Sequence, residues 1–248
     1  MMYFSRITIK PNALKSGEFL REWSNDGAGP YQIHKMVWKL YSDPYSNDLK
    51  RDFLYRVDLN SGRPVIYTVS DREPLDQYDM LSIETKPYNP MISDGMILGF
   101  TLRANPVVKR TNPTKNGVKG KQSRHDVVMD AKKRIREEKG DNADISMNEL
   151  IQQEGFRWLA NRSERCGFSI REGDVRADTY TQVSFRHGNK GEKNNEAKNN
   201  KIKNISYSTL DYNGVLTVTD SEKFNYALAH GIGPSKGFGC GLMMIRHV

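Results

Sequence analysis

The sequence predicts an α+β fold made of two consecutive βαββαβ units, and three observations lead to this prediction. The 248 residues are enough for two units of about half that length each. Strand and helix signals follow in the order strand, helix, strand, strand, weak helix, strand over residues 1–104, and a similar order with a longer insertion follows over residues 105–248. Hydrophobic residues make up 37% of the chain, which is enough for a packed core.

The first half opens with a period-two pattern and continues with a helical one. Tyr3–Ile9 alternates as a short strand, and Pro30 precedes an amphipathic helix over Tyr31–Tyr41. Two strands around the turn NSGR, a short weak helix and a third strand are then predicted at Phe53–Leu59, Pro64–Ser70, Leu75–Met80 and Met96–Ala104. This order is that of the split ferredoxin-like, or RRM-like, sandwich and assigns residues 1–104 to an N-terminal domain.

The second half, residues 105–248, is predicted as another unit of the same kind. Ser221 is expected to cap its last helix, which runs to His230. Its other predicted elements are two helices followed by four strands, at His125–Lys139, Met147–Arg162, Asp178–Phe185, Ile202–Tyr207, Tyr212–Thr219 and Leu242–Arg246. Two prolines near the join and a change to basic composition favour a domain boundary after residue 104.

The positive charge of the chain is concentrated in two segments. The net charge is +8, and residues 105–139 hold eleven Lys and Arg against four acids, while residues 186–203 hold six against two. Such local basic segments are typical of proteins that bind phosphate groups, above all nucleic acids. The alternative for either segment alone is a solvated loop whose lysines only keep the protein soluble.

Several classes of protein are excluded by missing signals. No window holds the roughly 18 apolar residues that a membrane helix needs, and Arg6 and Lys10 stand where a secretory signal would be apolar. Cys166 and Cys240 form no C-x-x-C pair, so we expect reduced thiols in a cytoplasmic protein. There is no phosphate-loop motif, and the five histidines are scattered, which argues against an ATPase, a kinase or a metal site.

The segment 231–241 contains five glycines in eleven residues, with Lys236 in the middle. A loop of this composition lets backbone N–H groups converge on an anion, and Lys236 would add a positive charge. The alternative is a tight connection between a helix and a strand, which we expect to account for one or two of the glycines. The composition therefore favours an anion or nucleic-acid contact.

Several segments of the chain together resemble one known family. They are GIGPSKGFGCGLM near the C-terminus, MYFSRITI at the N-terminus, PYQIHKMVWKLY in the predicted helix, LRANP at Leu102–Pro106, and YNGVLTVTD before the last helix. The chain resembles the CasE family, the CRISPR repeat-processing endoribonucleases of the type I-E Cascade system, from end to end and in the same order. The resemblance implies two tandem ferredoxin-like domains that bind a repeat hairpin and cut it without a metal or other cofactor, and whose product stays bound.

The resemblance also implies roles for particular residues. The catalytic histidine of the family falls on His34 and a nearby tyrosine on Tyr31. Basic residues of the second domain and the glycine-rich loop are expected to hold the RNA, and these are Lys115, Lys119, Lys121, Arg124, Arg186, Lys190, Lys236, Gly237 and Gly239. The expected partners are the CRISPR repeat RNA hairpin and other Cascade subunits, with no membrane and no small-molecule cofactor.

The residues themselves allow this chemistry. An RNA strand carries its own nucleophile, the 2′-OH, so an enzyme need only move protons and stabilise charge at the phosphate. Histidine suits that task, and His34 and Tyr31 are three residues apart on one helix face. Without the resemblance, a surface histidine packed beside Trp38 and an aromatic Tyr31 covering the first turn are the simpler interpretations. A non-catalytic RNA-binding scaffold subunit is the alternative for the whole protein.

Overall fold

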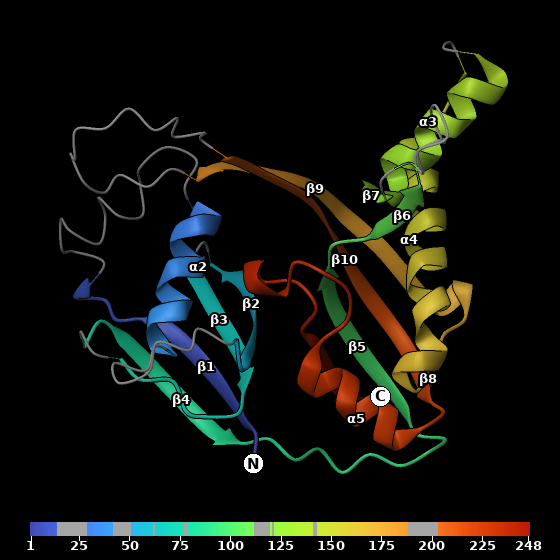
Figure 1. Cartoon of the computed structure of the whole chain (residues 1–248). Helices are drawn as coiled ribbons and strands as arrows, with labels where there is room; N and C mark the ends of the chain where they lie inside the picture. The colour runs from blue at the N-terminus through green and yellow to red at the C-terminus, as the bar shows by residue number, and fades with distance from the viewer. Residues whose placement is uncertain are drawn as a thin grey trace, which may run out of the picture.

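The computed structural model describes residues 1–13, 29–41, 51–61, 63–76, 79–111, 120, 122–140, 143–187 and 203–248. Two antiparallel sheets stand side by side, each with its helices (Figure 1). None of the helices within these ranges is long and apolar enough to span a membrane. The prediction of an α+β fold with two ferredoxin-like units is confirmed by the topology of the two sheets, as follows.

The first sheet has the strand order β2-β3-β1-β4, with every neighbouring pair antiparallel. Its strands are β1 (Tyr3–Ile9), β2 (Phe53–Asn60), β3 (Arg63–Ser70) and β4 (Leu81–Pro87). Helix α2 (Gly29–Leu40) packs on one face, where Val37 and Leu40 join Ile7, Tyr55 and Ile66 in a buried core. The strand and helix predicted at residues 3–9 and 31–41 are confirmed.

Two predictions for the first half are wrong. The described residues of the segment Leu75–Met80 are not helical, and the strand after the β2–β3 hairpin is β4, which pairs with β1 from Leu81 onwards. The strand predicted at residues 96–104 belongs to the second sheet instead. Because β4 already fills the edge beside β1, we propose that the boundary between the domains lies in the segment 88–96 and not after residue 104.

The second sheet repeats the strand order of the first. Its strands are β5 (Ile97–Ala104), β9 (Val175–His187), β10 (Lys203–Val218) and β11 (Met243–His247), and they pair as β11-β5-β10-β9. The short strand β8 (Phe168–Ser169) pairs with the end of β10. Helices α4 (Met147–Ser163) and α5 (Ser221–His230) supply Leu159 and Phe224 to the core of this sheet. In both sheets the four main strands thus follow the ferredoxin-like order 4-1-3-2.

Three details of the second half differ from the prediction. The two strands expected at residues 202–207 and 212–219 are one long strand, β10, and Asp220, not Ser221, caps α5 by accepting a hydrogen bond from the backbone N–H of Lys223. His125 lies on a strand instead of a helix. The helix predicted at residues 125–139 is present as α3 (Val127–Lys139). The elements that were not predicted are the hairpin of β6 (Val107–Thr111) with β7 (Gln122–Asp126) and short 3₁₀ turns at Glu164–Cys166, Glu172–Asp174 and Lys236–Phe238.

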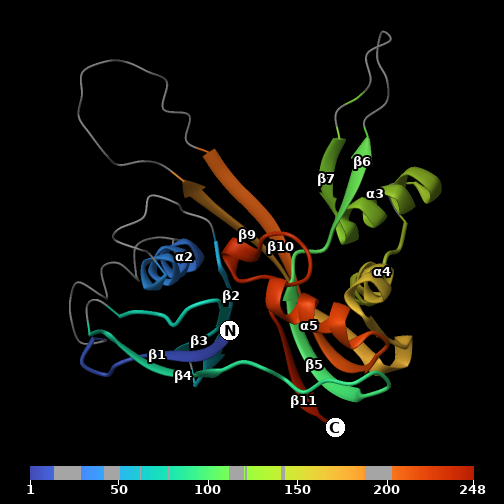
Figure 2. The same ribbon diagram turned by 60° about the horizontal axis from the view of Figure 1, so that its bottom comes forward.

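The two sheets are joined by specific contacts. The guanidinium of Arg103 on β5 donates two 2.7 Å hydrogen bonds to the carboxylate of Asp211 and a third of 2.7 Å to the carbonyl of Val57 on β2. Leu54 and Val69 of the first sheet pack with Leu242 just before β11. The strands β9 and β10 also reach from the second sheet towards α2 in both views (Figures 1 and 2). These contacts bring the glycine-rich loop against α2.

Candidate functional site

Helix α2 presents an aromatic face to the second half of the molecule. The His34 ring lies 5.9 Å from the Tyr31 ring, nearly parallel to it, and 5.8 Å from the Trp38 ring. Val37, three residues along the helix from His34, is fully buried in the core of the first sheet, and this fixes the rotation of the helix on its sheet. Lys35 is exposed, with its ammonium 5.2 Å above the Tyr31 ring. The prediction that Tyr31 and His34 share a face is confirmed.

The glycine-rich loop meets this face. The carbonyl of Gly237 lies 2.5 Å from Nδ1 of His34, and the ring of Phe238 stacks on the imidazole at 4.8 Å. Tyr207 of β10 stacks in turn on Phe238 at 5.5 Å. A row of four rings therefore runs from α2 to β10, with the imidazole inside it.

The contact with Gly237 determines how the imidazole can exchange protons. A carbonyl oxygen only accepts hydrogen bonds, so Nδ1 of His34 must carry the proton and donate it. In the neutral ring, the nitrogen that carries the lone pair and can accept a proton is then Nε2. This is the arrangement that a proton-transfer histidine needs, because one nitrogen is held while the other serves the substrate.

The carbonyl of Gly237 has a second donor that the sequence did not indicate. The hydroxyl of Tyr55, on β2, donates to it at 3.0 Å. Burial raises the pKa of Tyr55 far above its ordinary value, so this hydroxyl keeps its proton and remains a donor. The phenol is 2% exposed.

Backbone geometry explains more of the glycines than we expected. Four of the five, at positions 231, 233, 239 and 241, have φ between 77° and 93°, a region that other residues rarely adopt. At Gly239 a side chain would also lie 3.2 Å from the Tyr55 ring. Gly237 differs, since a Cβ there would meet only the His34 ring at 3.9 Å. The loop is thus a tight connection that also places a carbonyl beside His34.

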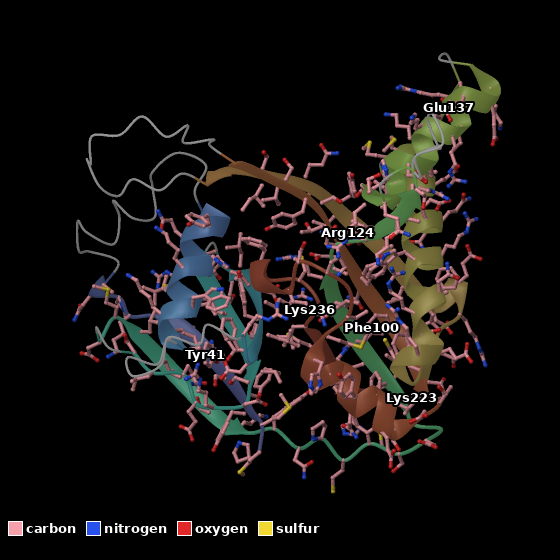
Figure 3. The ribbon with its side chains drawn as sticks, in the orientation of Figure 1. Tyr41, Phe100, Arg124, Glu137, Lys223 and Lys236 are labelled. Carbon is pink, nitrogen blue, oxygen red and sulfur yellow. The ribbon has the colours of Figure 1, made fainter. Side chains whose placement is uncertain are left out.

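A groove of about 920 Å³ lies on the second half, between the β6–β7 hairpin, α3, α4, α5 and the loop. Of the described residues, two acids, Asp130 and Glu154, line it together with nine basic residues, which are Lys109, Arg110, Arg124, Arg134, Arg157, Arg162, Arg165, Lys223 and Lys236. Of the three groove residues labelled in Figure 3, Arg124 lies highest in the view, with Lys236 and Lys223 below it. The groove therefore carries a strong positive charge.

Some of the basic side chains that line this groove are partly buried and lie close to other positive charges. The pKa of Arg162 is lowered, first by burial and then by the charge of the neighbouring Arg165. Its guanidinium stacks on the Trp158 ring at 4.0 Å. Burial also lowers the pKa of Lys236, whose ammonium donates to the carbonyl of His230 at 2.6 Å. Cations held together in this way favour an anionic partner.

The structure brings together only some of the residues singled out from the sequence. Arg124 and Lys236 line the groove, and Gly237 and Gly239 lie in the loop beside His34 and Tyr55. Arg186 lies on β9, and its side chain is outside the described part of the chain, as are Lys115, Lys119, Lys121 and Lys190.

The arginines of α4 and of the turn after it were not predicted from the sequence. Arg157, Arg162 and Arg165 line the groove, but three glutamates in residues 147–166 cancel them in a charge count. The helical spacing of these arginines predicts a shared exposed surface only if the buried face of α4 is already known. Within the described ranges, no three His, Cys, Asp or Glu side chains gather closely enough to hold a metal ion.

The fold and the site define a class: proteins with two ferredoxin-like units, a basic groove on one unit and a histidine where the units meet. The chain belongs to the CRISPR associated protein family, whose model matches residues 2–247. It is 26% identical over 246 residues to the "CRISPR system Cascade subunit CasE" of Escherichia coli K12, with 98% of each chain covered. It is 25% identical to the "CRISPR-associated endoribonuclease Cse3" of Thermus thermophilus, covering 98% of this chain and 99% of that protein.

A similar fold has been solved with RNA. The structure of "CRISPR endoribonuclease Cse3 bound to 19 nt RNA" matches with a TM-score of 0.64 and 24% identity, over 98% of each chain. These comparisons confirm the resemblance to the CasE family and the ferredoxin-like architecture.

Proposed function

We propose that this protein is an endoribonuclease that binds the hairpin of a CRISPR repeat, cuts the precursor RNA beside it, and stays bound to the product as a subunit of a Cascade complex in the cytoplasm. The observation that carries the proposal is the position of His34. Its Nδ1 is held by the carbonyl of Gly237, one residue along the chain from Lys236 in the basic groove. The names of the two curated relatives, an endoribonuclease and a Cascade subunit, support it.

The basic groove is the proposed binding site for the duplex stem of the RNA hairpin. Its arginines and lysines come from three helices, a hairpin and a loop, so they can meet phosphates along both strands of a duplex. Contacts of this kind position the RNA without reading its sequence. Lys115, Lys119 and Lys121 in the basic segment 105–139, and Arg186 and Lys190 in the basic segment 186–203, stay predicted RNA contacts.

The proposed chemistry uses the substrate's own nucleophile. The 2′-oxygen attacks the adjacent phosphorus while its proton leaves, and the bond from phosphorus to the 5′-oxygen breaks as that oxygen gains a proton. The products are a 2′,3′-cyclic phosphate and a 5′-OH. Nε2 of His34 performs one of the two proton transfers, and the Tyr31 hydroxyl, on the same helix face, is the second proposed group.

A labelled repeat RNA tests the proposal directly. We expect incubation with the protein to give one cut at the base of the hairpin, visible on a denaturing gel, with the hairpin fragment retained in a native gel. A protein that shifts the RNA in a native gel but leaves it uncut would be the scaffold subunit, and the proposed activity would be wrong.

The proposed role of the groove predicts a strong dependence of RNA binding on salt. The logarithm of the affinity should fall linearly with the logarithm of the salt concentration, by roughly 0.9 for each duplex phosphate contact. Replacing Arg124 with Gln should reduce that slope by nearly one unit, because one such contact is lost. Titrations of the hairpin by fluorescence anisotropy at several salt concentrations measure both slopes.

The matched control is Arg136, which is exposed on α3 but does not line the groove. Arg136→Gln should leave the slope unchanged. Both variants should melt within a degree or two of the wild type, since exposed charges contribute little to stability. Equal slopes for the wild type and Arg124→Gln would exclude this groove position from the RNA contact.

A further inference from the structure

One backbone carbonyl connects two side chains from different parts of the first half, the buried Tyr55 and the partly buried His34. The carbonyl oxygen of Gly237 receives the Tyr55 hydroxyl at 3.0 Å and Nδ1 of His34 at 2.5 Å. A carbonyl oxygen has two lone pairs, so these two donors fill its capacity. Tyr55 is thus linked to the histidine through the oxygen that both of them share.

The position of Tyr55 suits it to fix the direction of the Gly237 carbonyl. It lies on β2, in the middle of the first sheet's buried core, with its ring against Gly239 and near Phe53. The hydroxyl stays protonated because burial raises its pKa. The Tyr55 hydroxyl is held in place by the strand and core around it. The Gly237 peptide that accepts its hydrogen bond lies in a glycine-rich loop, whose backbone has more conformational freedom.

We propose that Tyr55 is a positioning residue for His34, and this inference rests on the proposed function. By fixing the direction of the Gly237 carbonyl, the Tyr55 hydroxyl keeps the proton of the neutral imidazole on Nδ1. Nε2 then faces the RNA with its lone pair. The tautomer of a histidine is set by the hydrogen bond that its other nitrogen makes, so a carbonyl that can turn away leaves a mixture of tautomers.

The second half supplies a matched control. Tyr212 on β10 is buried to the same degree as Tyr55, and its hydroxyl donates at 3.1 Å to the carbonyl of Gly155 in α4. It packs in the core of the second sheet, stacked on Trp158. Tyr212→Phe therefore removes a matching hydrogen bond, from a buried tyrosine to the backbone carbonyl of a glycine, away from the His34 contact.

The experiment compares Tyr55→Phe with Tyr212→Phe in the full chain. We expect Tyr55→Phe to slow single-turnover cleavage about tenfold, the scale of one lost hydrogen bond to the site, with the Kd for the hairpin unchanged within about twofold. In protein without RNA, ¹⁵N spectra of the imidazoles should show His34 protonated on Nδ1 in the wild type and as a mixture in Tyr55→Phe. Tyr212→Phe should change neither the rate nor the His34 spectrum.

Three outcomes would overturn the inference: wild-type cleavage by Tyr55→Phe, an unchanged His34 tautomer in that variant, or equal slowing by both tyrosine variants. The spectra also separate this inference from the proposed function. If His34→Asn cuts at the wild-type rate, the proposed role of His34 fails, and the tautomer measurement still reports whether Tyr55 holds the ring.

Discussion

A repeat RNA with a single 2′-deoxy nucleotide immediately 5′ of the cut should bind normally and remain intact. The missing oxygen is the proposed nucleophile, so no group on the protein can replace it, while the phosphates that meet the basic groove are unchanged. We expect cleavage of this substrate to fall below detection in a single-turnover assay, with its Kd equal to that of the all-RNA hairpin.

A deoxy substitution elsewhere in the stem is the control for this substrate and should be cut at the normal rate. Cleavage of the all-RNA hairpin should continue in excess EDTA and leave a cyclic phosphate on the upstream fragment, which mass spectrometry identifies. Continued cutting of the deoxy substrate at the same bond, or a complete stop in EDTA, would contradict attack by the 2′-hydroxyl assisted by His34.

The second large effect concerns His34 itself. His34→Ala should lower the single-turnover rate by about 10² or more, the usual scale for a lost general acid or base, and leave the hairpin affinity nearly unchanged. His34→Asn should be slowed as strongly, because an amide can still donate to the carbonyl of Gly237 but cannot exchange a proton at neutral pH. Rates come from quenched time courses with enzyme in excess.

Two variants make this result specific. His247→Ala, at the exposed end of β11, is the control and should cut at the wild-type rate. Tyr31→Phe should cost less than His34→Ala, because the ring that stacks beside the imidazole is retained. If His34→Asn kept full activity, the histidine would be a packing residue in the row of rings.

The parts of the fold that depend on local pattern could be predicted from the sequence. The strand at Tyr3–Ile9 and the helix over residues 31–41 follow from hydrophobic periodicity alone, and the structure places both within two residues of the prediction. The sheet to which a strand belongs could not be predicted in this way. Ile97–Ala104 has the same strand pattern whichever sheet it joins, and its partner on β10 lies more than 100 residues further along the chain.

The candidate site divides in the same way. The shared face of Tyr31 and His34 is a matter of helical spacing and could be predicted. The contact between His34 and Gly237 joins residues 203 positions apart, and no local pattern records it. The role of Tyr55 could not be predicted from the sequence, because a tyrosine in a strand pattern indicates only a core position. Its contact with the glycine-rich loop is seen only in the folded structure.

The span of 203 residues between the histidine and its acceptor has a consequence for the growing polypeptide. His34 is synthesised early, but the Gly237 carbonyl that accepts from its Nδ1 is in place only after the segment from Gly231 to Gly241 has been synthesised and folded against α2. During translation the chain can therefore display helix α2 without the hydrogen bond that directs Nε2. Given the proposed role of His34, we expect a chain that ends before Gly231 to leave the repeat RNA uncut.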